Sequence, residues 1–266
     1  MTSIFQALAE LEKSGQPGAL CTIISSQGST PRHVGSKMLV YPGGRFVGTV
    51  GGGEVEYRVL SEAQATIQSG QSKILDYSMT DPQRGDPGSC GGRLEIFVEP
   101  ILPMPLLVVI GCGHVGREVA HLAKWLGFRV AAVDDRAELC SPEQLPAADI
   151  FYPGEFSTLF DRLDLPQTAS VVLTTRNVDV DVKILPGLLE HKVAYLGVIG
   201  SRRRWATTKS QLSELGIPSE KITMIHSPIG LRLGAESPRE IAVSILAEIM
   251  MQRGQVDGES MSAQQK

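Results

Sequence analysis

The stretch PLLVVIGCGHVGREVA, residues 105–120, constrains the fold of this 266-residue chain more than any other. An apolar run typical of a buried strand leads into Gly111, Gly113 and Gly116, and the residues that follow have a helical pattern. In this context Gly111 makes a tight turn, Gly113 lets a phosphate approach the main chain, and Gly116 allows the helix to pack closely on the strand. The helix start adds oriented N–H groups and partial positive charge. The segment predicts a Rossmann-like phosphate loop, unless the glycines merely preserve the geometry of that fold.

Strand-like and helical segments alternate regularly after this loop. The apolar runs are LLVVIG, RVAAVDD, ADIFY, SVVLTT and AYLGVIG, and the helical segments lie near 115–126, 155–163, 180–190 and 202–215. A last helix is predicted from SPRE, where Ser237 and Glu240 form a capping box and Pro238 fits the first turn. Its apolar stripe is Ala242, Ile245, Leu246 and Ile249. Apolar strands separated by helices are typical of a doubly wound parallel sheet with both faces covered.

The first hundred residues have a different pattern. Ile4, Leu8 and Leu11 recur at helical spacing before Gly15, and a second helix is predicted to end at Gly70. Short β-branched or aromatic runs separated by glycine and proline surround the second helix, namely GALCTIIS, KMLVYP, RFVGTV, KILDYSM and RLEIFVEP. The prolines of VEPILPMP stiffen the chain near residue 103. We therefore expect a smaller α+β domain over 1–103, a Rossmann-like α/β domain over 104–252 and a flexible tail over 253–266.

Composition narrows the classes of function. A net charge of −4 argues against general nucleic-acid binding, and the sequence has no run of 18 apolar residues that could cross a membrane. The amphipathic start with Glu10 and Glu12 does not resemble a secretory signal, so a cytoplasmic location is expected. Four cysteines occur singly, which argues against a disulfide framework or a structural zinc site.

Polar residues at the ends of the predicted parallel strands are candidate ligand contacts. His114 in the glycine loop is either an anion donor or a solvent-facing residue at a helix start. Asp134 and Asp135 end the second strand at about the spacing of a ribose-binding acid. The segment GSRRRW places Gly200, Ser201, Arg202, Arg203 and Arg204 at another strand-to-helix junction. Arginines at the positive end of a helix are unfavourable unless an anion binds, which favours a second anion site over a solvated helix end.

The first half contributes glycine-rich loops. SSQGSTPRHVGSKMLV contains Arg32, His33 and Lys37, and GTVGGGEVE contains Gly51, Gly52 and Gly53. Such loops bring main-chain N–H groups and cations to a polar, anionic ligand, or else form tight hairpin turns. In GDPGSCGGRLEIFVEP, Cys90 lies between small residues before a strand. A thiol in this setting suits a nucleophile, a sulfur carrier or a soft metal ligand, the alternative being a buried apolar group.

Several of these motifs together resemble one family. GSTPRHVGSKM, GTVGGGEVE, SCGGRLEIFVEP, GCGHVGREVAHLAKWLGFRVAAVDDR, YLGVIGSRRRWA and PIGLRLGAESPREIAVSILAEI occur in the order found in the xanthine dehydrogenase accessory proteins, the XdhC/CoxI family. The resemblance covers roughly residues 5–252. It implies a protein that binds molybdenum cofactor, presents it to a cysteine desulfurase for sulfuration and inserts it into a molybdenum hydroxylase such as xanthine dehydrogenase.

The resemblance also assigns roles to residues. Cys90, in the family's CGG position, is the candidate catalytic thiol and metal contact, and Gln27, Ser29, Arg32 and Lys37 are candidate pterin or phosphate contacts. One loop departs from the family pattern, because Arg176, Asn177 and Val178 replace histidine-bearing positions while Asp181 is kept. A metal or proton-transfer role for that loop is therefore not expected here.

Two alternatives use the glycine loop differently. An NAD(P)-dependent oxidoreductase or a nucleotide-sensing regulator would bind a nucleotide there, and Asp134 and Asp135 favour the oxidoreductase more than any other residues do. The first half lacks a clear acid or base beside a carboxylate clamp, which hydride transfer to a small acid requires. We therefore expect a cofactor-binding chaperone more than a turnover enzyme, and the apolar last helix predicts a homodimer.

Overall fold

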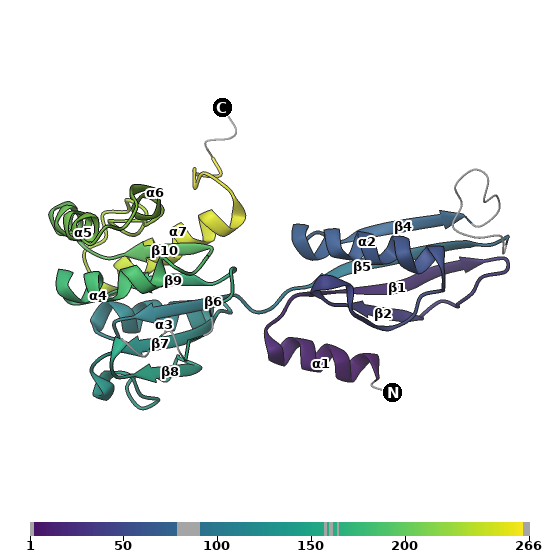
Figure 1. Ribbon diagram of the computed structural model, residues 1–266, viewed down its shortest axis with the longest axis horizontal. Coiled ribbons are helices and arrows are strands. Elements are labelled where there is room, and N and C mark those ends of the chain that lie inside the picture. Colours follow the sequence, from purple (N-terminus) through teal and green to yellow (C-terminus); the bar gives the residue numbers. More distant parts are fainter. Residues whose placement is uncertain (1–2, 79–90, 157–158, 160–161, 164, 263–266) are drawn as a thin grey trace. The chain divides into compact units, whose positions relative to one another are not determined.

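The computed structural model describes residues 3–78, 91–156, 159, 162–163 and 165–262. The chain divides into two compact units, Met1–Pro103 and Met104–Lys266, each with its own sheet (Figure 1). Cys90 and part of the helix expected near 155–163 lie outside the described residues. Within the described part of the chain, no helix is long and apolar enough to cross a membrane.

The first unit is an antiparallel sheet with one long helix against each face. Its elements are α1 (Ile4–Ser14), β1 (Gly18–Gln27), β2 (Lys37–Val40), a 3₁₀ turn (Pro42–Gly44), β3 (Phe46–Gly48), α2 (Glu54–Ser69), β4 (Lys73–Ser78) and β5 (Arg93–Ile101). The strands lie in the order β3-β2-β1-β5-β4. Long-range pairing of β1 with β5 forms the centre of the sheet, with Cys21 opposite Val98. Gly15 and Gly70 end the two helices in the left-handed conformation, as the sequence predicts.

The alternation of side chains along β1 divides the core of this unit in two. Cys21 and Ile23 face α2, where Val59 belongs to the same buried cluster, whereas Leu20 faces α1 and packs with Leu11. Figure 1 shows the two helices on opposite sides of the sheet. Each helix therefore buries one face of the sheet and leaves the strand ends and loops exposed.

The second unit is a parallel sheet covered by helices on both faces. Its elements are β6 (Leu106–Ile110), α3 (His114–Trp125), β7 (Arg129–Asp134), a 3₁₀ turn (Ala137–Leu139), β8 (Ile150–Pro153), β9 (Ser170–Leu173), α4 (Val178–Leu188), β10 (Tyr195–Val198), α5 (Arg202–Glu214), α6 (Ser219–Thr223) and α7 (Pro238–Gly254). The strand order is β10-β9-β6-β7-β8, all parallel. This arrangement confirms the predicted α/β class, with a Rossmann-like sheet beside a smaller α+β unit.

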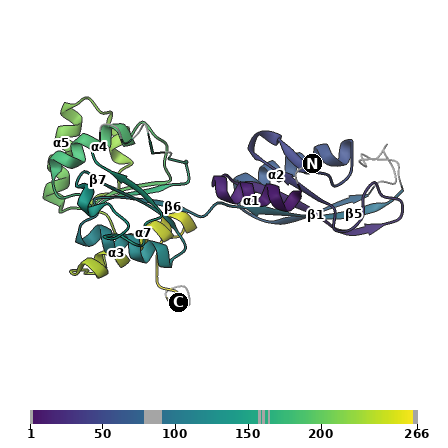
Figure 2. The same ribbon diagram turned by 90° about the horizontal axis from the view of Figure 1, so that it is seen from below.

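Two hydrophobic clusters cover the two faces of the parallel sheet. Helices α3 and α7 pack together over one face, and α4 and α5 cover the other (Figure 2). The predicted stripe of α7, Ala242, Ile245, Leu246 and Ile249, is buried in the first cluster. Strand order reverses between β6 and β9, and ligands of such sheets bind at the carboxyl ends of the strands beside this point. The carboxyl edge of the sheet is therefore where a site is expected.

The described helices differ from the predicted ones at two places. Helix α6 has five residues and was not anticipated, because so short a segment has no recurring apolar stripe. Helix α4 begins at Val178, two residues earlier than expected, because the Asn177 side chain accepts a hydrogen bond from the Val180 N–H and caps the helix.

Candidate functional site

The glycine loop after β6 has three glycines with three different steric environments. Gly111 has φ 105°, and a Cβ there would lie 2.7 Å from the carbonyl carbon of Thr174. A Cβ on Gly116 would lie 1.9 Å from the Gly111 carbonyl oxygen. At Gly113, by contrast, no described atom lies within 4 Å of the added carbon. Gly111 and Gly116 are thus required by the protein's own packing, whereas Gly113 leaves space outside the loop.

Helix α3 starts directly at this loop. Gly113 is its N-cap, so the cap offers no side chain to the first N–H groups, and exposed His114 is the first helical residue. The first turn contains no acidic residue. The Thr174 hydroxyl donates to the Gly111 carbonyl oxygen at 2.6 Å and so ties the loop after β9 to this loop. The arrangement presents main-chain donors and partial positive charge toward an anion.

Asp134, the predicted ribose-binding acid, is directed into the protein. Its carboxylate is only 1% exposed and accepts from the Cys112 N–H at 2.7 Å. The main chain and guanidinium of Arg136 also donate to it, at 3.0 Å each. A ribose hydroxyl would therefore have to displace Arg136 to reach this carboxylate.

A second acid–arginine pair adjoins it. Arg176 donates two hydrogen bonds of 2.6 Å to Asp135, which joins the ends of β7 and β9. The Arg176 guanidinium holds the pKa of Asp135 below its ordinary value. The loop that departs from the family pattern thus has structural functions, an ion pair through Arg176 and a helix cap through Asn177.

Arg204 forms the most buried ion pair of the described residues. Its guanidinium donates to the fully buried Asp181 at 2.7 and 3.1 Å, to the Thr175 hydroxyl at 2.8 Å and to the Thr175 carbonyl at 3.0 Å. Burial raises the pKa of Asp181, and the hydrogen bonds from Thr175 and Arg204 oppose that rise. Sequence reasoning grouped Arg204 with the anion site. The signal that it missed was Asp181, an acid in the apolar stripe of a helix, which requires a buried cation.

The neighbouring residues at the start of α5 face solvent. Ser201 caps this helix by accepting from the Arg204 N–H at 3.2 Å, and Arg202 and Arg203 are exposed. Gly200 precedes the cap. The loop after β9 contacts Gly111 through Thr174 and Arg204 through Thr175. The two predicted anion-binding helix starts, α3 and α5, therefore occupy the same edge of one sheet.

The loops of the first unit also bring several predicted residues together. A Cβ on Gly92 would lie 2.8 Å from the Gln27 carbonyl oxygen and 2.3 Å from that of Ser29. Gly91 and Gly92, which follow Cys90 in the sequence, thus lie against the main chain of the loop after β1. Cys90 itself lies outside the described residues.

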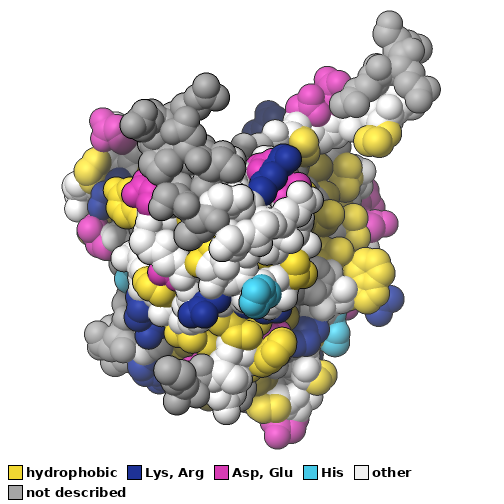
Figure 3. Space-filling view, turned by 90° about the vertical axis from the view of Figure 1, so that its right-hand side faces the viewer, with side chains coloured by type: hydrophobic (Ala, Val, Ile, Leu, Met, Phe, Trp, Pro, Cys, Tyr) yellow, Lys and Arg dark blue, Asp and Glu magenta, His cyan; other side chains and the backbone are white. Residues whose placement is uncertain are grey.

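The GTVGGGEVE segment lies beside the same loop. The Cβ position of Gly51 is 3.4 Å from the Pro31 ring, next to exposed Arg32, while Gly52 and Gly53 are exposed at the start of α2. Lys37 pairs with the start of this segment, since its carbonyl oxygen accepts from the Thr49 N–H, and its ammonium group donates to the Thr22 hydroxyl at 2.9 Å. The face in Figure 3 carries hydrophobic and basic side chains side by side.

The remaining cysteines are buried. Cys21 belongs to the core between α2 and its sheet, and Cys112 and Cys140 lie in the cluster under the glycine loop. Burial raises the pKa of Cys21 to about 12, so this thiol stays protonated. Among the described residues, no group of three or more His, Cys, Asp or Glu side chains could hold a metal ion.

Two protein-family models match this chain. A family model described as XdhC Rossmann domain matches residues 107–249, which includes the glycine loop and both helix starts, and one described as XdhC and CoxI family matches residues 11–78. The chain belongs to the XdhC and CoxI family. The resemblance inferred from the sequence motifs is thereby confirmed.

Individual proteins are similar in sequence to this member of the XdhC and CoxI family over most of its length. It is 37% identical over 258 residues to uncharacterized protein YqeB of Escherichia coli, covering 96% of the chain and 47% of that protein. It is 35% identical to a probable xanthine dehydrogenase subunit of Bacillus subtilis, covering 61% of the chain and 47% of that protein. The chain thus spans about half the length of these two relatives.

Two further proteins align with this chain over nearly the full length of both sequences. The molybdenum cofactor insertion chaperone PaoD of Escherichia coli is 26% identical over 280 residues, with 93% of this chain and 87% of that protein covered. A crystal structure described as a xanthine dehydrogenase from Bacillus halodurans has a TM-score of 0.52 at 22% identity, covering 96% of this chain and 97% of the other. The latter likeness shows a shared fold.

Proposed function

We propose that this XdhC and CoxI family member binds molybdenum cofactor as its cargo, supports sulfuration of that cofactor and inserts it into a molybdenum hydroxylase of the xanthine dehydrogenase type. A relative named as a molybdenum cofactor insertion chaperone and another named as part of a probable xanthine dehydrogenase support this proposal. The proposed partners are the hydroxylase, a cysteine desulfurase that supplies sulfur, and a second copy of the chain.

The carboxyl edge of the parallel sheet is the observation that carries the proposal. Gly113 leaves the first turn of α3 accessible, and Arg202 and Arg203 are exposed at the first turn of α5. Molybdopterin ends in a phosphate, and main-chain N–H groups at a helix start together with guanidinium groups favour such an anion. These residues would hold and orient the phosphate, and a hold made of surface hydrogen bonds also permits release to the next protein.

Cys90 enters the proposal from the sequence alone. A thiol among small residues suits contact with the metal end of the cargo or with the incoming sulfur. Of the described residues that follow it, Gly92 lies against the carbonyl groups of Gln27 and Ser29, two further residues that the sequence assigns to cofactor contact. The proposal therefore assigns this loop to the reactive end of the cofactor.

A nucleotide-dependent function, either an NAD(P)-dependent oxidoreductase or a nucleotide-sensing regulator, ranks second. The position of Asp134 at the end of β7 favours it, since an acid there binds the ribose of dinucleotides. Against it, the carboxylate of Asp134 already accepts hydrogen bonds from Cys112 and Arg136. A dinucleotide would have to compete with an existing ion pair.

Reconstitution of a cofactor-free hydroxylase tests the first proposal. The chain is mixed anaerobically with molybdenum cofactor, then with the hydroxylase, and both cofactor binding and recovered activity are measured. Arg203→Ala should weaken cofactor binding roughly tenfold, because it removes a charge-assisted hydrogen bond. Gly113→Ala should also weaken it while the fold is kept, because φ at Gly113 is −73° and the added methyl group occupies only the space outside the loop. Cys90→Ala should retain binding and lose delivery of active cofactor.

Lys209→Ala is the matched control, because it removes an exposed cation further along the same helix as Arg203. The site assignment would be wrong if Arg203→Ala, Gly113→Ala and Cys90→Ala all bound and delivered the cofactor as well as the wild type does. Turnover of a nicotinamide cofactor by a wild-type protein that fails to bind molybdenum cofactor would reverse the ranking of the two functions.

A further inference from the structure

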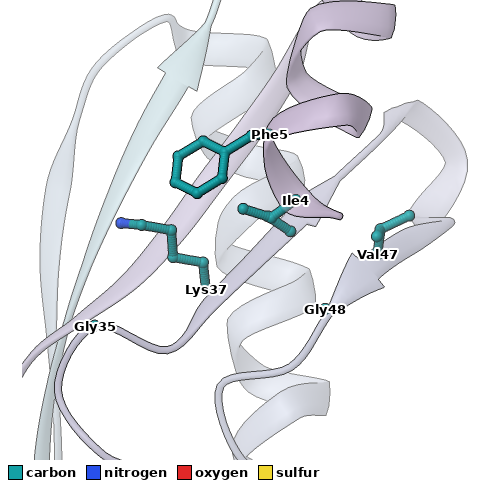
Figure 4. Close-up of a pocket in the computed structure, with 6 residues that line it drawn as sticks. All are labelled: Ile4, Phe5, Gly35, Lys37, Val47 and Gly48. Carbon is teal, nitrogen blue, oxygen red and sulfur yellow. The ribbon is translucent and has the colours of Figure 1, made fainter. Parts of the chain in front are cut away.

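We propose, resting on the function above, that a pocket on the first unit binds the pterin ring system of the cargo through the aromatic ring of Phe5 and the ammonium group of Lys37. The pocket is lined by Ile4, Phe5, Gly35, Lys37, Val47 and Gly48 (Figure 4). It lies between the start of α1 and the strands β2 and β3. Gly35 and Lys37 belong to the motif GSTPRHVGSKM, and Gly48 belongs to GTVGGGEVE.

The size of the pocket favours a single flat ring system. Its volume is about 260 Å³, slightly below the range of ~300–1,000 Å³ for small-molecule sites. A pterin is a flat bicyclic ring, whereas a dinucleotide is far larger. Ile4 and Val47 give the pocket apolar walls, and Gly35 has no described atom within 4 Å of an added Cβ, which keeps its mouth open.

Phe5 supplies an aromatic face. Its side chain is 71% exposed at the first turn of α1, although the rest of that helix buries its apolar stripe through Ala7 and Leu11. A single exposed aromatic residue needs no explanation by itself. Here it borders a pocket. Figure 4 shows the Phe5 ring and the Lys37 amine on one side of the pocket, Val47 on the other side and Ile4 in the middle. An exposed ring in this position is suited to stacking on a heteroaromatic ligand.

Lys37 supplies a cation in a fixed place. Its ammonium group donates to the Thr22 hydroxyl at 2.9 Å, which holds it at the pocket. An ammonium group has three donors, so an anionic ligand can receive further hydrogen bonds from it. A pterin with an anionic substituent combines the two features that the pocket recognises, a flat aromatic system and a negative charge.

The main chain of β3 adds donors and acceptors. The Thr49 N–H donates to the Lys37 carbonyl and the Tyr41 N–H donates to the Arg45 carbonyl, so odd-numbered residues of this segment face β2. By the same register the N–H and C=O groups of Phe46 and Gly48 face the open edge of the sheet, where β3 is the last strand. Of these two residues Gly48 lines the pocket, and its N–H and C=O groups supply a donor and an acceptor for the amide-like edge of a pterin ring.

The shape of this edge disfavours a peptide strand as the occupant. Strand β3 has three residues, and Gly48 has φ 85°, a left-handed conformation that bends the chain. A short edge strand with such a bend offers too few aligned groups for strand addition. The pocket is therefore assigned to a small ring system and not to a segment of a partner protein.

Binding of two fluorescent probes, neutral pterin and 6-carboxypterin, tests the assignment. The full chain should bind both. Phe5→Ala should weaken both by roughly fivefold or more, as loss of base–aromatic stacking does. Lys37→Met keeps an unbranched side chain but removes the charge, so it should weaken 6-carboxypterin and leave pterin unchanged. The control is Tyr57→Ala, which removes another aromatic ring, 72% exposed, from α2 on the other face of the sheet.

The same variants are then assayed for cofactor delivery to a cofactor-free hydroxylase. The pocket assignment would be overturned if the wild type bound neither probe, or if Phe5→Ala and Lys37→Met kept the wild-type melting temperature and bound both probes as the wild type does. In either case, delivery of cofactor by the wild-type protein would still uphold the proposed function. A wild type that binds both probes but never takes up molybdenum cofactor would instead refute the function. If Phe5→Ala binds pterin normally and loses association with the hydroxylase, the pocket is a protein contact and the assignment is wrong.

Discussion

At the residue scale, Arg203 and Arg204 are neighbours in a run of three arginines but differ in what they contact. Arg203 is exposed, whereas Arg204 pairs with Asp181, which is fully buried. Residue type and local charge pattern are the same for both, so the sequence alone could not separate them. The difference arises from the turn of the helix, which directs Arg204 back toward the loop after β9.

Arg204→Ala should destabilise the second unit by ~3–5 kcal/mol, because it leaves a buried carboxylate without its cation. Arg203→Ala, its matched control, should change the free energy of unfolding by no more than ~0.5 kcal/mol. Urea unfolding of both variants measures the difference. Equal stability of the two variants would contradict the buried ion pair.

Asp135 should make stability depend on pH in the acid range. Its pKa is below the ordinary value because Arg176 donates to it in the folded protein. The stabilisation is therefore present above pH ~4, the ordinary aspartate pKa, and is lost as pH falls through the lowered folded value. Since the pair is partly exposed, ~0.5–1 kcal/mol is expected. Wild type and Asp135→Asn should differ by this amount at pH 7, and the difference should shrink steadily as the pH is lowered below 4; a constant difference would argue against the pair.

The turns of the glycine loop could be predicted from the sequence, whereas the partners of its neighbouring charged side chains could not. The tight turn at Gly111 and the close packing at Gly116 follow from the motif, and the structure has both. The pairing of Asp134 with Arg136 did not follow, because a motif specifies where an acid stands and not whether its oxygens are already occupied. Such contacts depend on side-chain directions that the sequence pattern does not encode.

At the element scale, capping residues gave the most accurate predictions. Gly15, Gly70 and the capping box of Ser237 with Glu240 end or begin helices where the sequence places them. These signals are local, since the hydrogen bonds that they form join residues three or four positions apart. Helix α6 and the early start of α4 were missed because the first is too short to show a period and the second depends on Asn177 as its cap.

Ser237→Ala should remove the N-cap of α7 and destabilise the second unit by ~1 kcal/mol, because the Glu240 N–H loses its acceptor. For a unit of this size, a fall of ~2–4 °C in melting temperature is expected. Ser213→Ala, an exposed serine near the end of α5, serves as the control and should leave the melting temperature nearly unchanged. Equal shifts in the two variants would show that the cap contributes nothing.

At the scale of the whole molecule, the parallel arrangement of the second sheet could be predicted, whereas the strand pairing of the first sheet could not. Regular alternation of apolar strands and helices admits few topologies, and the order β10-β9-β6-β7-β8 is a common one. The first unit pairs β1 with β5 across about seventy residues, and β4 with β5 across the segment outside the described residues. No local pattern selects these pairings, so the α+β class of the first unit could be predicted without its strand order.

Residues 104–266 should fold without the first unit, because both faces of their sheet are covered by their own helices. Circular dichroism should show native helix content and a single cooperative unfolding transition for this fragment. The matched fragment 104–236 lacks α7, exposes the cluster that α3 shares with it, and should fail to unfold cooperatively. Cooperative unfolding of both fragments would show that α7 is dispensable.

The packing of α3 against α7 has a consequence for the order of events during synthesis. Helix α3 begins at the glycine loop near residue 113, yet the apolar stripe of α7 that packs against it extends to Ile249. A nascent chain on the ribosome therefore exposes the underside of α3 until more than a hundred further residues have been translated. The underside of α3, and with it the glycine loop, therefore acquires its full packing only after the last helix of this unit has been made.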